Sequence, residues 1–217
     1  MNAIQELIAN NKYGQALEVV NAELAGDEYN IELLTLKAQI NNKLEQYNEA
    51  IEIFNILINL LPNNAEYHAA RGLSYHAMGE HQQTLADLST AIELEPENGY
   101  RYASRAFIKD FIGLHLEALD DYNKAIELDP EDAVSLNNRG LVEEKLGRMQ
   151  LAQDSFKRAD ELSGGEIQEH SPIAQQANEV KEEKSTKLNF KYFIGILKSL
   201  FTSPSERKKF INFLFKR

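Results

Sequence analysis

Leu94-Glu95-Pro96-Glu97-Asn98 and Leu128-Asp129-Pro130-Glu131-Asp132 are near copies of one another, and they lie 34 residues apart. Pro62 lies a further 34 residues before Pro96. Because proline has no backbone N–H and cannot continue a helix, each copy marks the end of a helix and a turn into the next unit. Numbering the proline as position 32 divides the chain into frames 31–64, 65–98, 99–132 and 133–166.

Residue size repeats with the same period. We expect each frame to be a hairpin of two helices, in which small residues at positions 8, 20 and 27 let the helices approach closely. Glycine near position 15 ends the first helix, where a positive φ is favoured. Large apolar residues at positions 24 and 30 fill the space between hairpins, because no single hairpin buries its apolar face alone. Position 8 is Ala38, Gly72, Ala106 and Gly140, and position 24 is Phe54, Leu88, Tyr122 and Phe156.

This pattern resembles the tetratricopeptide-repeat (TPR) family over residues 31–166. The resemblance implies an all-α fold, a right-handed α-solenoid of TPR helical hairpins, whose function is to bind proteins. Four residues depart from the family pattern, and we interpret them as local irregularities. They are Glu45 for Gly, Thr84 and Leu57 for Ala, and Gly164 for Pro.

The flanking segments carry weaker signals. Residues 1–30 fit a degenerate N-terminal TPR-like cap, because Tyr13 and Ala16 fall in register with the later frames. Residues 167–187 predict a capping helix at about 172–184 followed by a linker, since Ser171-Pro172 is typical of a helix start. Residues 188–217 predict a basic amphipathic helical tail.

Charge is divided unevenly along the chain. The net charge is −11, yet residues 187–217 carry eight basic residues and one acid. The acidic remainder would repel nucleic acid, so we expect no nucleic-acid partner. There is no cysteine, which excludes disulfides and thiolate zinc sites and favours a reducing compartment. With no signal-peptide pattern and no stretch of about 20 apolar residues, we expect a cytoplasmic protein, with a membrane-peripheral location as the alternative.

A ligand groove is implied by the resemblance, because TPR arrays bind extended peptides or helices on a concave face lined by the first helix of each repeat. An apolar centre is expected at Leu73, Phe107 and Leu141; the alternative is that these three side chains pack between helices. The cations with which one TPR subset grips the C-terminal carboxylate of chaperones are missing, so we expect no such clamp. The predicted groove residues are Gln39, Asn42, Leu73, His76, Tyr100, Ser104, Phe107, Asn138 and Leu141.

A basic ladder occupies position 7, with Lys37, Arg71, Arg105 and Arg139 at intervals of 34 residues. It could bind anions, or its members could pair with acids of the second helices such as Asp87 and Asp121. We favour pairing, since charges repeated in register usually satisfy neighbouring units.

Signals for catalysis are missing. His76 and His81 are close in sequence, but a spacing of five does not put them on one helix face. There is no metal-binding HExxH pattern, phosphate-binding glycine loop or nucleophile elbow. We therefore expect a non-enzymatic protein with no cofactor and no bound metal.

The tail leaves three interpretations open. It could lie in a membrane surface, since basic amphipathic helices bind anionic lipid. It could bind protein, either its own solenoid or another chain, which gives an autoinhibited or oligomeric state. It could also be a helical hairpin that closes the core. The leading hypothesis for the whole chain is a protein–protein interaction scaffold or adaptor, and the alternatives are a peripheral membrane adaptor and a self-associating scaffold. The predicted tail contacts are Phe193, Leu197, Phe201, Lys208, Lys209 and Phe213.

Overall fold

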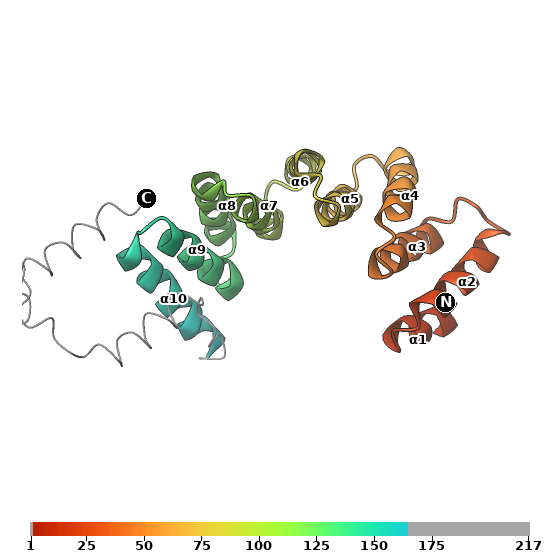
Figure 1. The fold of residues 1–217 in the computed structure, drawn as a ribbon, viewed down its shortest axis with the longest axis horizontal. Helices are drawn as coiled ribbons and strands as arrows, with labels where there is room; N and C mark the ends of the chain where they lie inside the picture. The colour runs from red at the N-terminus through yellow and green to blue at the C-terminus, as the bar shows by residue number, and fades with distance from the viewer. Residues whose placement is uncertain (1, 165–217) are drawn as a thin grey trace, which may run out of the picture. The chain divides into compact units, whose positions relative to one another are not determined.

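The computed structural model describes residues 2–164, which form ten α-helices and no β-strand (Figure 1). The helices follow one another in pairs joined by short turns. Their bounds are α1 Asn2–Ala9, α2 Tyr13–Leu24, α3 Ile31–Lys43, α4 Tyr47–Leu60, α5 Ala65–Ala77, α6 His81–Leu94, α7 Gly99–Phe111, α8 His115–Leu128, α9 Ala133–Lys145 and α10 Met149–Ser163.

The helix starts repeat with the period found in the sequence. First helices begin at Ile31, Ala65, Gly99 and Ala133, and each is 13 residues long. In the described part of the chain, each helix packs mainly against its neighbours in sequence, with a small additional contact between α7 and α9. The predicted all-α solenoid of helical hairpins is confirmed.

A polar side chain begins each first helix. Asn30, Asn64, Asn98 and Asp132 lie 34 residues apart, and each accepts a hydrogen bond from a backbone N–H of the first turn. This satisfies donors that have no partner inside the helix. The second helices α4, α6, α8 and α10 have no such side-chain cap.

The turn inside each hairpin uses a left-handed residue. Gly79, Gly113 and Gly147 have φ values of 79°, 86° and 73°. Glu45 and Asn11 have φ values of 60° and 57° at the equivalent places, although they carry side chains. The prediction that position 15 ends the first helix with a positive φ is confirmed, and the substitution of Glu45 for glycine did not change the backbone.

Close helix approach explains the small residues at position 8. A Cβ added to Gly72 would lie 3.1 Å from the Cβ of Asp87 and 3.3 Å from the carbonyl oxygen of Thr84. At Gly140 it would lie 2.5 Å from the ring of Phe156. Alanine fills the same place in the other two hairpins, where Ala38 and Ala106 are completely buried.

The apolar core is divided along the chain. One large cluster joins α1 to α5, from Ile4 through Phe54 and Leu57 to Tyr67. Further along, the buried clusters are smaller, and one of them links three helices through Leu88 and Ile108. Each cluster includes residues of more than one hairpin, as expected for units that bury apolar surface only by stacking. The predicted capping helix at 172–184 and the tail lie outside the described residues.

Candidate functional site

Three successive first helices surround a pocket of about 370 Å³, which we name the α7 pocket. Helix α5 contributes one side chain, α7 contributes four, and the rest belong to α9 and its cap. The α7 pocket is lined by Leu73, Tyr100, Ala103, Ser104, Phe107, Asp132, Val134, Ser135 and Asn138. Sequence analysis predicted five of these residues: Leu73, Tyr100, Ser104, Phe107 and Asn138.

Four large apolar side chains around the α7 pocket are exposed. Leu73 is 47% exposed, Tyr100 68%, Phe107 52% and Val134 64%. About half of the surface of Leu73 and of Phe107 is therefore accessible, which favours the groove interpretation over packing between helices. Leu141 is half-buried and does not line the pocket. An exposed apolar patch of this kind is typical of an interaction surface.

Several polar groups of the α7 pocket are used by the protein itself, whereas the buried Ser135 hydroxyl has no hydrogen-bond partner among the described residues. The Ser104 hydroxyl donates to the carbonyl of Tyr100 at 2.8 Å. One carboxylate oxygen of Asp132 accepts from the N–H groups of Val134 and Ser135, both at 3.0 Å. Asn138 forms a side-chain hydrogen bond with Tyr122, whose pKa is raised by burial. The surface offered to a ligand is therefore mainly the apolar faces of Leu73, Tyr100, Phe107 and Val134.

Three other predicted groove residues lie away from this pocket. Gln39 is exposed on α3. Asn42 accepts a hydrogen bond of 2.9 Å from the hydroxyl of Ser74, so it joins α3 to α5. His76 packs edge-on against the ring of Phe111, with centroids 4.9 Å apart. The predicted tail residues Phe193, Leu197, Phe201, Lys208, Lys209 and Phe213 lie outside the described residues.

His76 and His81 lie close together although their spacing in the sequence did not predict it. His76 ends α5 and His81 begins α6, so the turn between the helices brings their rings to 5.7 Å despite the unfavourable spacing. Burial, and to a smaller extent the neighbouring His81, lower the pKa of His76. Among residues 2–164, no group of three or more His, Asp or Glu side chains is placed to hold a metal ion.

The basic ladder holds the hairpins together. Arg71 makes two hydrogen bonds to the Asp87 carboxylate, at 2.8 and 2.6 Å, and a third to Asn55 of the preceding hairpin at 2.6 Å. Arg105 repeats this with Asp121, at 2.8 and 2.7 Å, and with Ser89 at 3.0 Å. These bonds raise the pKa of both arginines. The pairing interpretation is confirmed for Arg71 and Arg105.

The ends of the ladder differ from this prediction. Position 23, which supplies the aspartate in the two middle hairpins, is Ser155 in the last one, and Arg139 donates to its hydroxyl at 3.1 Å. Arg139 also donates to Asn123 of the preceding hairpin at 3.3 Å. In the first hairpin the same position is Ile53, which offers Lys37 no acid.

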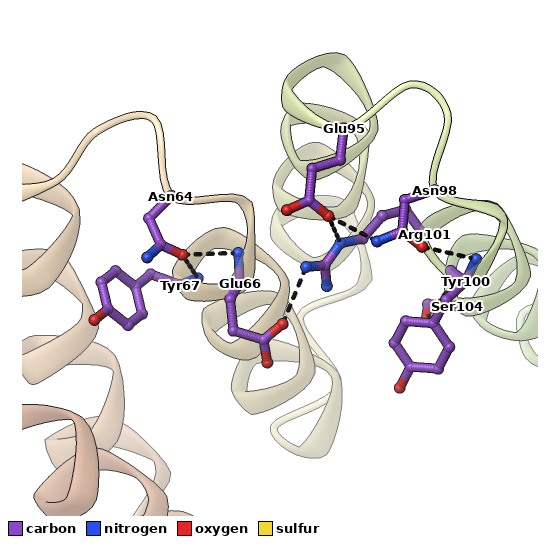
Figure 2. Close-up of polar contacts among 8 residues, drawn as sticks. All are labelled: Asn64, Glu66, Tyr67, Glu95, Asn98, Tyr100, Arg101 and Ser104. Atoms are coloured by element: carbon purple, nitrogen blue, oxygen red, sulfur yellow. Dashed lines mark hydrogen bonds and ion pairs between the residues drawn. The ribbon is translucent and has the colours of Figure 1, made fainter. Parts of the chain in front are cut away.

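A buried arginine of α7 makes ion pairs with two carboxylates (Figure 2). Arg101 is 6% exposed, and it donates to Glu95 at 2.8 Å and to Glu66 at 3.0 Å. Burial disfavours its charge, but the two carboxylates outweigh this effect and raise the pKa of Arg101. In return, the hydrogen bond from Arg101, followed by that from Asn98, lowers the pKa of Glu95. Sequence analysis did not predict this contact between α5, α7 and the turn that follows α6.

A second, more open recess of about 650 Å³ adjoins these residues, and we name it the acidic recess. It lies where α6 and α8 end and α7 begins. Three carboxylate residues belong to it, and it shares Tyr100 with the α7 pocket. It is lined by Glu95, Pro96, Glu97, Asn98, Gly99, Tyr100, Leu128 and Asp129.

Comparison with family models matches the tetratricopeptide repeat at residues 31–64, 101–132 and 121–154. The first of these ranges coincides with the first frame read from the sequence. A sequence search among characterised proteins gave no significant match. No helix within residues 2–164 is long and apolar enough to cross a membrane.

Solved structures show the same architecture. A crystal structure of MamA has a TM-score of 0.67 at 23% identity, covering 78% of this chain and 99% of the other. YrrB, described as a TPR protein with an unusual peptide-binding site, has a TM-score of 0.61 at 18% identity. The match covers 82% of this chain and 90% of YrrB. TTC0263, a thermophilic TPR protein of Thermus thermophilus, has a TM-score of 0.61 at 19% identity. The match covers 77% of this chain and 91% of TTC0263.

Repeat models and fold agree with the 34-residue pattern of the sequence. The chain contains tetratricopeptide repeats, which the family models match within residues 31–64 and 101–154.

Proposed function

We propose that this protein is an interaction scaffold that binds a peptide or helix of a partner protein in the α7 pocket. This proposal rests on one observation, the exposure of four large apolar side chains around the α7 pocket: Leu73, Tyr100, Phe107 and Val134. A folded protein gains stability by burying such side chains, so their accessibility on three neighbouring helices favours a binding role over a structural one.

The energetics suit a reversible interaction. Fully burying one large apolar side chain contributes about 1.5–3 kcal/mol, and these four side chains are already partly covered. Association also costs rotational freedom and the ordering of the ligand. We therefore expect an affinity on the order of micromolar, which corresponds to about −8 kcal/mol.

A relative with the same fold supports the proposal. YrrB is described as having a peptide-binding site. In our protein the α7 pocket presents apolar side chains and is lined by no lysine or arginine. A ligand held mainly by apolar contacts fits this surface better than a free carboxylate does.

Affinity purification followed by mass spectrometry tests the proposal. Phe107→Glu places a charge at the centre of the α7 pocket, and we expect it to abolish recovery of the partner. The matched control is Leu116→Glu, since Leu116 is 56% exposed on α8 and does not line the pocket. Circular dichroism verifies that both variants fold. Equal recovery of partners by the wild type and Phe107→Glu would exclude the α7 pocket as the binding surface.

A further inference from the structure

Tyr100 lies between two surfaces of different character. One side chain borders both the apolar α7 pocket and the acidic recess. A ligand that spans Tyr100 therefore meets apolar side chains and, directly beside them, carboxylates. This inference rests on the proposed function, in which the α7 pocket is the binding surface. The two neighbouring surfaces then indicate which chemical groups its ligand carries.

Charges in the acidic recess are only partly balanced. Arg101 neutralises Glu95, but Glu97 and Asp129 also line the recess. The nearby Lys124 pairs with Glu127 at 2.9 Å. Helices α6 and α8 end at the recess, and the C-terminal end of a helix attracts cations. The N–H of Tyr100, in the first turn of α7, already donates to the side-chain oxygen of Asn98 at 3.1 Å.

The surrounding charge has the same sign. Residues 2–164 carry 28 acidic and 13 basic side chains. A ligand that combines bulky apolar side chains with lysine or arginine is therefore complementary to both parts of the surface. An acidic or purely apolar ligand is complementary to at most one of them.

One segment of the chain itself has this chemistry. Residues 188–201 read Leu-Asn-Phe-Lys-Tyr-Phe-Ile-Gly-Ile-Leu-Lys-Ser-Leu-Phe, with two lysines and no acid. Lys191 stands between Phe190 and Tyr192, and Lys198 follows Leu197. We propose that the α7 pocket and acidic recess of one copy bind residues 188–201 of a second copy, with lysines toward the carboxylates and aromatic or aliphatic side chains in the pocket.

Sedimentation velocity of the full chain over a range of concentrations tests this self-association. We expect the wild type to associate as its concentration rises, and to associate less at high salt because charge pairs are screened. Phe107→Glu in the pocket and the double change Lys191→Glu, Lys198→Glu in the segment should each weaken association at least tenfold. Leu116→Glu, the exposed control on α8, should leave it unchanged.

Charge exchange gives a sharper test. The double change Glu97→Lys, Asp129→Lys makes the recess basic and should stop self-association, as the lysine-to-glutamate pair in the segment does. A mixture of these two variants should associate again, because each then offers a complementary surface to the other. Loss of folding cannot produce this rescue, and circular dichroism of each variant alone verifies the fold.

Several results would overturn the inference. They are a full chain that stays monomeric at all concentrations, association that Phe107→Glu leaves intact, and a mixture that fails to associate. Binding to phosphatidylserine vesicles by a chain that remains monomeric would assign the segment to a lipid surface instead. If the chain is monomeric yet Phe107→Glu changes the partners recovered by affinity purification, the proposed function stands and only self-association fails.

Discussion

At the scale of single residues, Glu45 adopts a left-handed backbone conformation that normally favours glycine. Its φ of 60° matches the left-handed turns at Gly79, Gly113 and Gly147. A residue with a Cβ is strained in this conformation by about 1–2 kcal/mol. The packing of α3 against α4 nevertheless holds Glu45 in this conformation, because a different turn would shift the two helices relative to one another.

Replacing Glu45 by glycine should raise the free energy of unfolding by about 0.5–1 kcal/mol, since the relief of strain exceeds the entropy that glycine adds to the unfolded chain. Urea denaturation followed by circular dichroism measures this change. The matched control is Glu52→Gly, at an exposed position inside α4, which should lower stability by about 0.5–1 kcal/mol. A loss of stability in Glu45→Gly would show that its side chain makes a compensating contact.

At the scale of elements, the caps decide where the first helices begin. Asn64 accepts from the N–H groups of Glu66 and Tyr67, at 3.0 and 3.3 Å. The same position is Asn30, Asn98 and Asp132 in the other hairpins. All of these residue types accept hydrogen bonds from the first turn and so favour a helix start. Asn64, Asn98 and Asp132 each lie two residues after a repeated proline, so the caps could have been predicted from the sequence.

We predict that Asn64→Ala lowers the free energy of unfolding by about 1 kcal/mol, because two N–H groups at the start of α5 lose their acceptor. Thermal and urea denaturation both report this loss. Asn63→Ala provides the comparison, since Asn63 is an exposed neighbour of the same type and its replacement should change stability by less than about 0.5 kcal/mol. Equal effects at the two positions would contradict a capping role.

At the scale of the whole described unit, cohesion depends on contacts between successive hairpins. Ile108 of α7 is completely buried in a cluster with Ala69 of α5 and Leu88 of α6. The larger cluster nearer the N-terminus is separate and ends at Tyr67. Stability in such arrays is approximately the sum of each unit and its interfaces with its neighbours.

Ile108→Ala should lower the free energy of unfolding by about 2–5 kcal/mol, through lost burial and the cavity left behind. It should also make unfolding less cooperative, because it weakens the interface between α6 and α7. Hydrogen exchange should then show faster opening of α7 to α10 while α3 and α4 remain protected. Leu116→Ala, at an exposed apolar position, is the control. A uniform increase of exchange in all helices would contradict a segmented core.

Sequence reasoning found part of the candidate site and missed part of it for identifiable reasons. Tyr100 and Phe107 were predicted from their repeat positions, and both line the α7 pocket. Val134 occupies the same repeat position as Tyr100 and could have been predicted in the same way. A spacing of five does not put His76 and His81 on one helix face, but a turn places them on two helices and brings the two imidazole rings together.

The sequence by itself determined the repeat length, the hairpins and the small residues at their contacts, because each of these depends on neighbours within one period of 34 residues. The tertiary structure alone decided which apolar side chains stay exposed. Leu73, Phe107 and Val134 come from three different hairpins, and their burial depends on the size and spacing of helices that pack beside them. It also placed Arg101 between Glu66 and Glu95, a contact that the repeat pattern does not contain because the other frames have no arginine at the position of Arg101.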